Sequence, residues 1–152
     1  MGIWAERPLY QSPPEDATLG FSSDGTGWMY WASWSTGFEA QVFTWSARDA
    51  GVLVVRVHTE LGGTWSMDDR KRSVHDMETV ELIDAELTWK YQIVTGVNYL
   101  GEPAVILHLD HPFTEGLTGN TFSRVIEPGP HVPLPLLENR NEGPTDPGNQ
   151  GP

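Results

Sequence analysis

Large apolar residues recur at every second position along much of the first 126 residues. In the range 87–94 the odd positions hold Leu, Trp, Tyr and Ile, and the positions between them hold Thr, Lys, Gln and Val. In 53–58 Leu and Val alternate in the same way with Val, Arg and His. Side chains of a strand point alternately to two faces, so this period predicts half-buried β-strands. No window shows a 3.6-residue apolar stripe over three helical turns.

Turn-forming residues divide this part of the chain into about nine short strands. The pair Asp24-Gly25 within 22–27 predicts a hairpin, because both residues accept the positive φ that a tight turn requires. Asp84-Ala85 is expected to separate two later strands. The strands are expected at 3–6, 18–21, 28–34, 38–46, 52–60, 79–83, 86–94, 104–109 and 121–126.

One segment, 66–76, lacks the alternation. It is polar and its charges cancel, and Ser66 is followed three positions later by Asp69, which resembles a weak capping box. We therefore expect a single short helix there.

The succession of hairpins predicts the fold class. A long run of antiparallel strands must close on itself or split into two sheets to hide its edges. Strands that follow one another by tight turns favour an all-β, antiparallel up-and-down barrel of about eight to nine strands. A Greek-key sandwich is the alternative.

The composition changes near residue 127. Residues 127–152 hold seven of the chain's 12 prolines and no aromatic residue. Such a segment buries too little apolar surface to offset the entropy of ordering it. We expect a barrel domain at 1–126 and a tail at 127–152, docked at most through 131–137 as an extended strip and disordered beyond.

Size and charge narrow the class of protein. The 152 residues and 16.9 kDa suit one domain, which can bury a core without a disulfide or a metal. The chain has no cysteine, which excludes a thiol nucleophile and a thiolate zinc site. A net charge of −12 makes nucleic acid and anionic membrane poor partners. Without an apolar run of about 18 residues or a secretion signal, we expect a soluble, cytoplasmic protein.

Several short motifs resemble one family of β-barrels. Residues 2–4, Gly-Ile-Trp, are similar to the G-x-W signature of lipocalins and their calycin relatives. The hairpin 19–27, followed by Phe-Thr-Trp at 43–45 and Gly-Val-Leu at 51–53, resembles bacterial lipocalin-like domains. Those domains repeat an Asp-Gly-Thr-Gly turn, an F-x-W strand and a G-x-L strand. The resemblance covers about 2–126 and implies a lipocalin-like barrel.

The same resemblance assigns a structural role to Trp4 and Arg124. In that family the signature indole packs across the barrel floor against an arginine of the last strand, and Arg124 stands where that partner is expected. A partly desolvated cation over an indole face contributes on the order of 1–2 kcal/mol, so the pair would close one end of the barrel. The alternative is that the two side chains never meet.

The most aromatic strand begins at Trp28. Its even positions Trp28, Tyr30 and Trp34 share one face, while Met29 and Trp31 share the other. Because both faces carry large apolar groups, one of them must pack against another element, contact a partner or line a cavity. We retain two interpretations of the outer face, a binding surface or a surface covered by the apolar strip of the tail.

The next strand combines aromatic and polar residues on one face. Phe43 and Trp45 share that face with Glu39 and Gln41. A small barrel can hold one small ligand, and an apolar pocket with a few polar groups is the usual form of such a site. The alternative places Glu39 at the solvated rim. The candidate ligand-binding residues are Trp31, Glu39, Gln41, Phe43, Trp45, Trp89 and Tyr91.

A second polar group lies on the strand 52–60. Arg56, His58 and Glu60 occupy the face opposite Leu53, Val55 and Val57. We interpret this alternation as a solvated outer face. The competing interpretation is an acid–base pair of His58 and Glu60.

Catalytic and metal motifs are weak or absent. His108, Asp110 and His111 form the most metal-like cluster, but no third histidine stands at ligand spacing, so we expect no metal. The sequence has no G-x-S-x-G, P-loop, Rossmann fingerprint or H-E-x-x-H. We therefore assign no catalytic residue and no cofactor.

These observations favour one function and leave two others open. A barrel with aromatic walls suits a small apolar or aromatic molecule. A cofactor-free cyclase of natural-product biosynthesis is the enzymatic alternative, acting through a closed cavity and one polar anchor such as Glu39 or Tyr91. The third is a protein–protein module that uses the aromatic strand 28–34, with a homodimer as one form.

Overall fold

Eight strands make up the fold, which comes from a computed structural model. The structure describes residues 1–6, 15–33, 35–49, 51–68 and 71–125, and no helix occurs among them. The strands are β1 (Gly2–Ala5), β2 (Glu15–Phe21), β3 (Thr26–Ser33), β4 (Gly37–Arg48), β5 (Val52–Asp68), β6 (Lys71–Val97), β7 (Pro103–Leu109) and β8 (Thr121–Val125).

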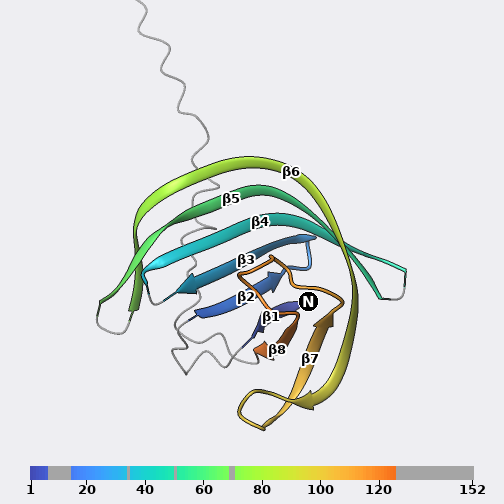
Figure 1. The fold of residues 1–152 in the computed structure, drawn as a ribbon. Coiled ribbons are helices and arrows are strands. Elements are labelled where there is room, and N and C mark those ends of the chain that lie inside the picture. Colours follow the sequence, from blue (N-terminus) through green and yellow to red (C-terminus); the bar gives the residue numbers. More distant parts are fainter. Residues whose placement is uncertain (7–14, 34, 50, 69–70, 126–152) are drawn as a thin grey trace, which may run out of the picture.

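The strands form one closed antiparallel sheet. Each strand pairs with its neighbours in sequence, and β8 pairs with β1. Figure 1 shows β4, β5 and β6 arching over β1, β2 and β3. A Greek key would need a non-sequential neighbour, so the up-and-down barrel predicted from the sequence is confirmed. The expected tail at 127–152 and its strip 131–137 lie outside the described residues.

The predicted hairpin at Asp24-Gly25 joins β2 to β3. Gly25 has φ +82°, and the Asp24 carboxylate accepts hydrogen bonds from the Thr26 N–H at 2.9 Å and the Thr26 hydroxyl at 2.6 Å. An Asp side chain that bonds the backbone two residues ahead stabilises a turn. The turn sets the register in which Phe21 lies opposite Gly27.

The predicted break at Asp84-Ala85 is wrong, because β6 runs through it without interruption over 27 residues. Val57 of β5 lies opposite Ala85, whereas Thr59 lies opposite Leu82. Two residues of β6 therefore face a single residue of β5, which is the geometry of a β-bulge. Asp84 therefore lies in a bulge and not in a turn. The expected strands 79–83 and 86–94 are both parts of β6, so the barrel has eight strands instead of nine.

The short helix expected at 66–76 is also wrong. Ser66 lies in β5 and pairs with Ser73 of β6, and Asp68 pairs with Lys71. A polar segment with no apolar alternation carries little information about its own conformation. Here cross-strand hydrogen bonds to a partner close in sequence determine the structure, as in any hairpin.

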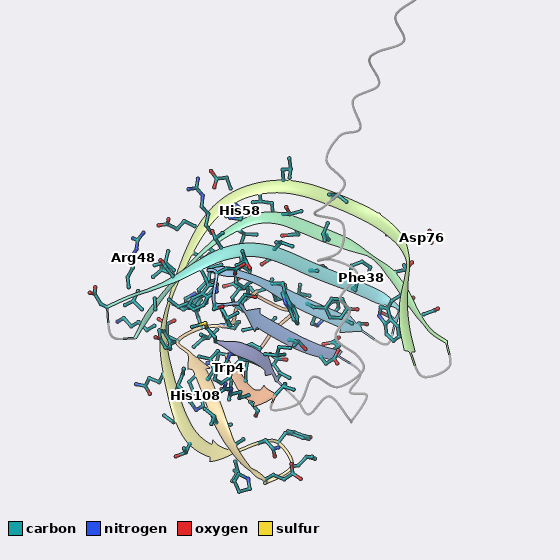
Figure 2. All side chains as sticks on the ribbon, turned by 180° about the vertical axis from the view of Figure 1, so that it is seen from behind. Trp4, Phe38, Arg48, His58, Asp76 and His108 are labelled. Carbon is teal, nitrogen blue, oxygen red and sulfur yellow. The ribbon has the colours of Figure 1, made fainter. Side chains whose placement is uncertain are left out.

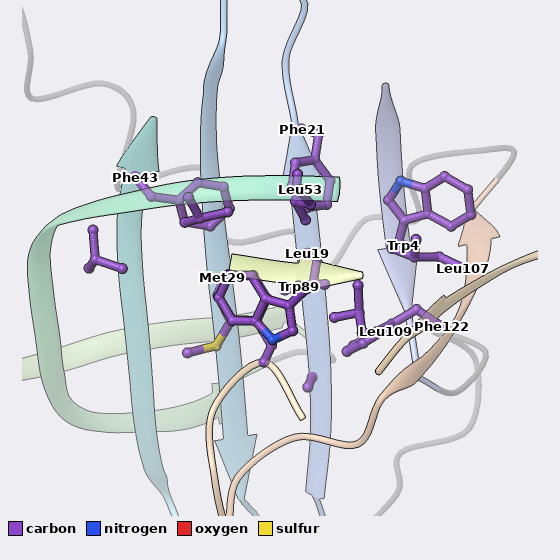
Figure 3. Packing of buried hydrophobic residues seen from close by; sticks show 14 residues of the cluster. Trp4, Leu19, Phe21, Met29, Phe43, Leu53, Trp89, Leu107, Leu109 and Phe122 are labelled. Atoms are coloured by element: carbon purple, nitrogen blue, oxygen red, sulfur yellow. The ribbon is translucent and has the colours of Figure 1, made fainter. Parts of the chain in front are cut away.

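The main core fills the inside of the barrel. It contains Trp4, Ala17, Leu19, Phe21, Met29, Phe43, Leu53, Val55, Val57, Trp89, Leu107, Leu109, Phe113 and Phe122, most of them labelled in Figure 3. Trp31, Trp45 and Tyr91 pack against this cluster from its margin. The inner face of β3 is therefore the one that carries Met29 and Trp31.

A second apolar cluster lies on the outer face of β3, β4 and β5. Tyr30 and Phe38 stack with ring centroids 5.9 Å apart and an angle of 21° between their planes. The cluster comprises Tyr30, Ala32, Phe38, Ala40, Leu61 and Trp65, with Trp28 at its margin. All but Trp28 are buried, so β3 packs apolar groups on both faces, as its sequence predicts. The tail strip proposed to cover this face lies outside the described residues.

Candidate functional site

An apolar pocket of about 210 Å³ lies inside one end of the barrel. Figure 2 labels Arg48, where β4 ends, at this end of the molecule, and Phe38 and Asp76 at the other. The walls come from six strands, β1, β2, β4, β5, β6 and β7, and from the residue that precedes β1. The lining residues are Met1, Trp4, Phe21, Trp45, Ala47, Leu53, Tyr91, Ile93 and Leu107.

Two of the predicted ligand-binding residues, Trp45 and Tyr91, line this pocket. The indole N–H of Trp45 donates to the backbone oxygens of Thr26 at 2.9 Å and Ser22 at 3.2 Å, which fixes the ring against the β2–β3 turn. Phe21 meets the same indole edge to face, with centroids 5.3 Å apart. The wall is therefore rigid on this side, because the ring is held at both its polar and its apolar edges.

Trp4 of β1 forms another part of the wall. The register of β1 and β8 places Trp4 directly opposite Arg124, so both side chains lie on the same face of the sheet. Trp4 is buried, while Arg124 is exposed. The Arg124 Nε lies 3.4 Å from the place that a Cβ at Gly2 would occupy. Gly2 thus leaves room for this side chain.

Phe43 and Trp89, also predicted to contact a ligand, are packed in the core instead of lining the described pocket. Each is 1% exposed. Phe113, from the loop between β7 and β8, lies between them, with its ring centroid 4.7 Å from that of Trp89 and 5.5 Å from that of Phe43. These three rings fill the middle of the barrel.

The remaining predicted residues, Trp31, Glu39 and Gln41, gather on the inner face beyond these rings. Trp31 lies opposite Glu39 in the register of β3 and β4, and Gln41 lies opposite Glu60 of β5. The Gln41 amide N–H donates to the Glu60 carboxylate at 3.1 Å. The group is an acidic polar surface on β3, β4 and β5, of which β4 and β5 also contribute to the apolar pocket.

Two polar atoms of this surface are buried and make no hydrogen bond within the described chain. They are the indole nitrogen of Trp31 and the side-chain oxygen of Gln41. Partial burial raises the pKa of Glu39, and the nearby negative charge of Glu60 raises it further. The surface therefore offers one free donor, one free acceptor and a carboxylate that holds its proton more tightly than usual.

Glu60 is on the inner face because of a bulge at His58. The register jumps from Val57, opposite Phe43, to Thr59, opposite Val42, and the extra residue reverses the alternation. His58 instead bonds the Thr44 hydroxyl, with 2.9 Å between Nε2 and Oγ1. The predicted common face of Arg56, His58 and Glu60 is therefore wrong for Glu60.

The histidine cluster near the end of β7 has ordinary partners. Nδ1 of His108 lies 3.1 Å from the Thr121 hydroxyl, and Nδ1 of His111 lies 2.9 Å from the Asp110 carboxylate. Among the residues that the structure describes, no three His, Cys, Asp or Glu side chains are grouped so that they could hold a metal ion.

Sequence reasoning missed several pocket residues. Ile93 belongs to the apolar alternation at 87–94, and Leu107 lies in the expected strand 104–109. Neither signal shows which end of a strand borders a cavity. Met1 lies outside any pattern. Glu60, which belongs to the acidic polar surface, was expected on the outer face, because the sequence gives no sign of the bulge that decides its face.

Comparisons with protein-family models, with curated proteins and with solved structures find no match for this chain. Within the described ranges, no helix combines the length and apolar character needed to cross a bilayer.

Proposed function

We propose that this chain is a lipocalin-like barrel that binds a small apolar or aromatic molecule at the end of its interior. The observation that carries the proposal is the pocket of about 210 Å³ whose walls include Trp4, Phe21, Trp45 and Tyr91. Aromatic walls bury a large area of a planar ligand and restrict its orientation through ring geometry. Apolar concave sites with few polar groups are the usual form of small-molecule sites.

The pocket volume limits the ligand's size. An apolar cavity of about 150 Å³ accommodates benzene, and drug-sized sites start at roughly 300 Å³. A volume of about 210 Å³ therefore suits a compact molecule of one or two rings. The core rings of Phe43, Trp89 and Phe113 stand between this pocket and the acidic surface, so such a ligand binds without reaching Glu39.

A neutral fluorescent ligand tests the proposal. 1-Aminonaphthalene has two fused rings and is neutral at pH 7, and its emission moves to shorter wavelength in apolar surroundings. We expect saturable 1:1 binding with a dissociation constant of about 1–100 μM. Ala47 is exposed and lines the pocket, so Ala47→Phe should fill the space and abolish binding.

Ala47→Ser is the matched control, because it changes the same position without adding bulk, and it should bind as the unchanged protein does. Emission that never saturates, or equal binding by the Phe and Ser variants, would remove the basis for this function.

A further inference from the structure

β6 has a long edge without a neighbouring strand. From Lys71 to Lys90 it pairs with β5, and only from Tyr91 to Val97 does its other edge pair with β7. Within the described chain, no strand pairs with that second edge before Tyr91. In Figure 1, β6 forms the outermost strand of the arch. Unpaired N–H and C=O groups along such an edge can add a further strand.

The part of this edge between residues 76 and 86, here called the β6 edge, has a different character on each face. Val80 is 60% exposed and Leu82 is 88% exposed, and Val80 lies opposite the outward-facing Leu61. Glu81 lies opposite Glu60 and so belongs to the inner face. Over 79–82 the outer face of the edge is therefore apolar, whereas the inner face carries the acidic Glu81.

The charges of the β6 edge are all negative. Residues 76–86 contain five acidic residues and no Lys, Arg or His; the acids are Asp76, Glu78, Glu81, Asp84 and Glu86. Arg56 bonds one of them, Asp84, with Nε–Oδ1 and Nη2–Oδ2 distances of 2.5 and 2.7 Å. Like charges that lie directly opposite one another, as Glu60 and Glu81 do, destabilise a sheet. A cation placed beside them would relieve this repulsion.

We propose that the β6 edge binds an extended segment of a partner protein in which Lys or Arg alternates with apolar residues. Backbone hydrogen bonds would add the segment as a further strand, as in other cases of β-augmentation. Its basic side chains would lie on the inner face beside Glu81 and Glu60. Its apolar side chains would cover Val80 and Leu82 on the outer face. The alternation of apolar and acidic side chains along the β6 edge thus determines the alternation of apolar and basic side chains in the partner segment.

Charge excludes the two other strands that could occupy the edge. A second copy of the chain would place five acidic residues against another five, in a protein of net charge −12. The chain's own residues 127–152 carry four acidic residues and one arginine. Both would add repulsion to an edge whose own residues include no cation, whereas a basic segment gains attraction from the same charges.

The register limits where the segment pairs. Residues 79–82 of β6 lie opposite 59–62 without a shift, and residues 85–90 lie opposite 52–57 in the same regular way. The bulge between these runs bends the strand. The segment therefore pairs with the first run, where the exposed Val80 and Leu82 are found.

The test uses the full chain and a peptide of about eight residues in which Lys and Val alternate, a common strand length. Hydrogen exchange measured by NMR should show that, on addition of the peptide, exchange slows for those amides in 79–82 that face the free edge instead of β5. A peptide of the same charge with one Val replaced by Pro cannot form a continuous strand and should not slow them. Leu82→Ser and Glu81→Gln should each weaken binding about tenfold at low salt.

Glu115→Gln is the control for charge, because Glu115 is an exposed acid in the β7–β8 loop, away from the edge. It should leave the affinity unchanged. Equal binding of both peptides, or equal losses in Glu81→Gln and Glu115→Gln, would show charge attraction alone and overturn the proposal. Slow exchange of the 79–82 amides that face the free edge, before any peptide is added, would overturn it too, because another strand would already hold the edge. Sedimentation would identify a second copy.

Discussion

Trp89 and Phe113 lie face to face in the middle of the barrel, with ring centroids 4.7 Å apart and planes only 6° apart. Phe113 belongs to the loop between β7 and β8, whereas Trp89 lies on β6. The Trp89 indole N–H also donates to the backbone oxygen of Pro112 at 3.3 Å. The loop is thus anchored to β6 by one stacked ring and one hydrogen bond, and it fills the interior that a wider cavity would need.

We expect Phe113→Ala to lower the free energy of unfolding by about 3–5 kcal/mol. The side chain is 3% exposed, and its loss would leave a cavity beside Phe43 and Trp89. Urea denaturation followed by tryptophan fluorescence measures the change. Val97→Ala, at a position 63% exposed, should change it by less than about 0.5 kcal/mol. A loss below about 1 kcal/mol for Phe113→Ala would mean that the loop does not hold the core together.

Gly20 and Gly37 should respond in opposite ways to substitution by alanine. A Cβ at Gly20 would lie 2.3 Å from the Trp28 indole, so Gly20→Ala must displace that ring and should cost about 1–3 kcal/mol. A Cβ at Gly37 would meet nothing within 4 Å, so Gly37→Ala should be neutral or stabilise by up to about 1 kcal/mol.

Thermal unfolding measures the stability of both glycine variants. The emission maximum of tryptophan should move only in Gly20→Ala, because only that change displaces an indole. If both variants lost the same stability, the indole of Trp28 would not lie against Gly20.

Much of the fold follows from the sequence because most strands have one apolar face. The alternation at 53–57 and 87–93 locates parts of β5 and β6, and Asp24-Gly25 locates the first hairpin. The far part of the β5–β6 hairpin, between the expected strands 52–60 and 79–83, could not be found in this way, because its polar sequence shows no apolar alternation. Asp84 resembles a turn residue in the sequence, although it lies in the bulge of β6 opposite His58.

The candidate site is less predictable, because it depends on which end of each strand is filled. The sequence correctly places Trp45 on the same face as Phe43, and both point inward. It does not show that Phe113, far away in the chain, fills the space beside Phe43 and leaves the pocket at Trp45. Packing between distant segments decides this, and alternation carries no information about it.

The raised pKa of Glu39 predicts a pH-dependent effect of Glu39→Gln. A carboxyl whose pKa is higher in the folded state than in the unfolded state binds more protons when the protein is folded. The free energy of unfolding therefore falls as the pH rises from the unfolded pKa to the folded pKa. The penalty is complete above the folded pKa and absent below the usual value of 4.5. Glu39→Gln should therefore be more stable than the unchanged protein at pH 7, and this advantage should disappear below pH 4.5.

Urea midpoints measured across this interval test the expectation. An advantage of Glu39→Gln that persists unchanged at low pH would point to altered packing instead of proton linkage.

Asp84 should titrate in the opposite direction from Glu39. Its hydrogen bonds to the Arg56 guanidinium, together with that group's positive charge, lower the pKa of Asp84 below its ordinary value of 3.8. The pair stabilises the fold above the unfolded pKa, and this contribution is lost as the pH falls through the folded pKa.

NMR titration of the Asp84 carboxyl carbon should give a midpoint below 3.8, and in Arg56→Gln this midpoint should return toward 3.8. Arg56→Lys keeps the charge but cannot form the two-pronged contact, so its midpoint should fall between these two. Because the side chains of Arg56 and Asp84 are 55% and 67% exposed, added salt should reduce the shift in every variant that retains a cation. A midpoint unaffected by replacing Arg56 would contradict the pairing.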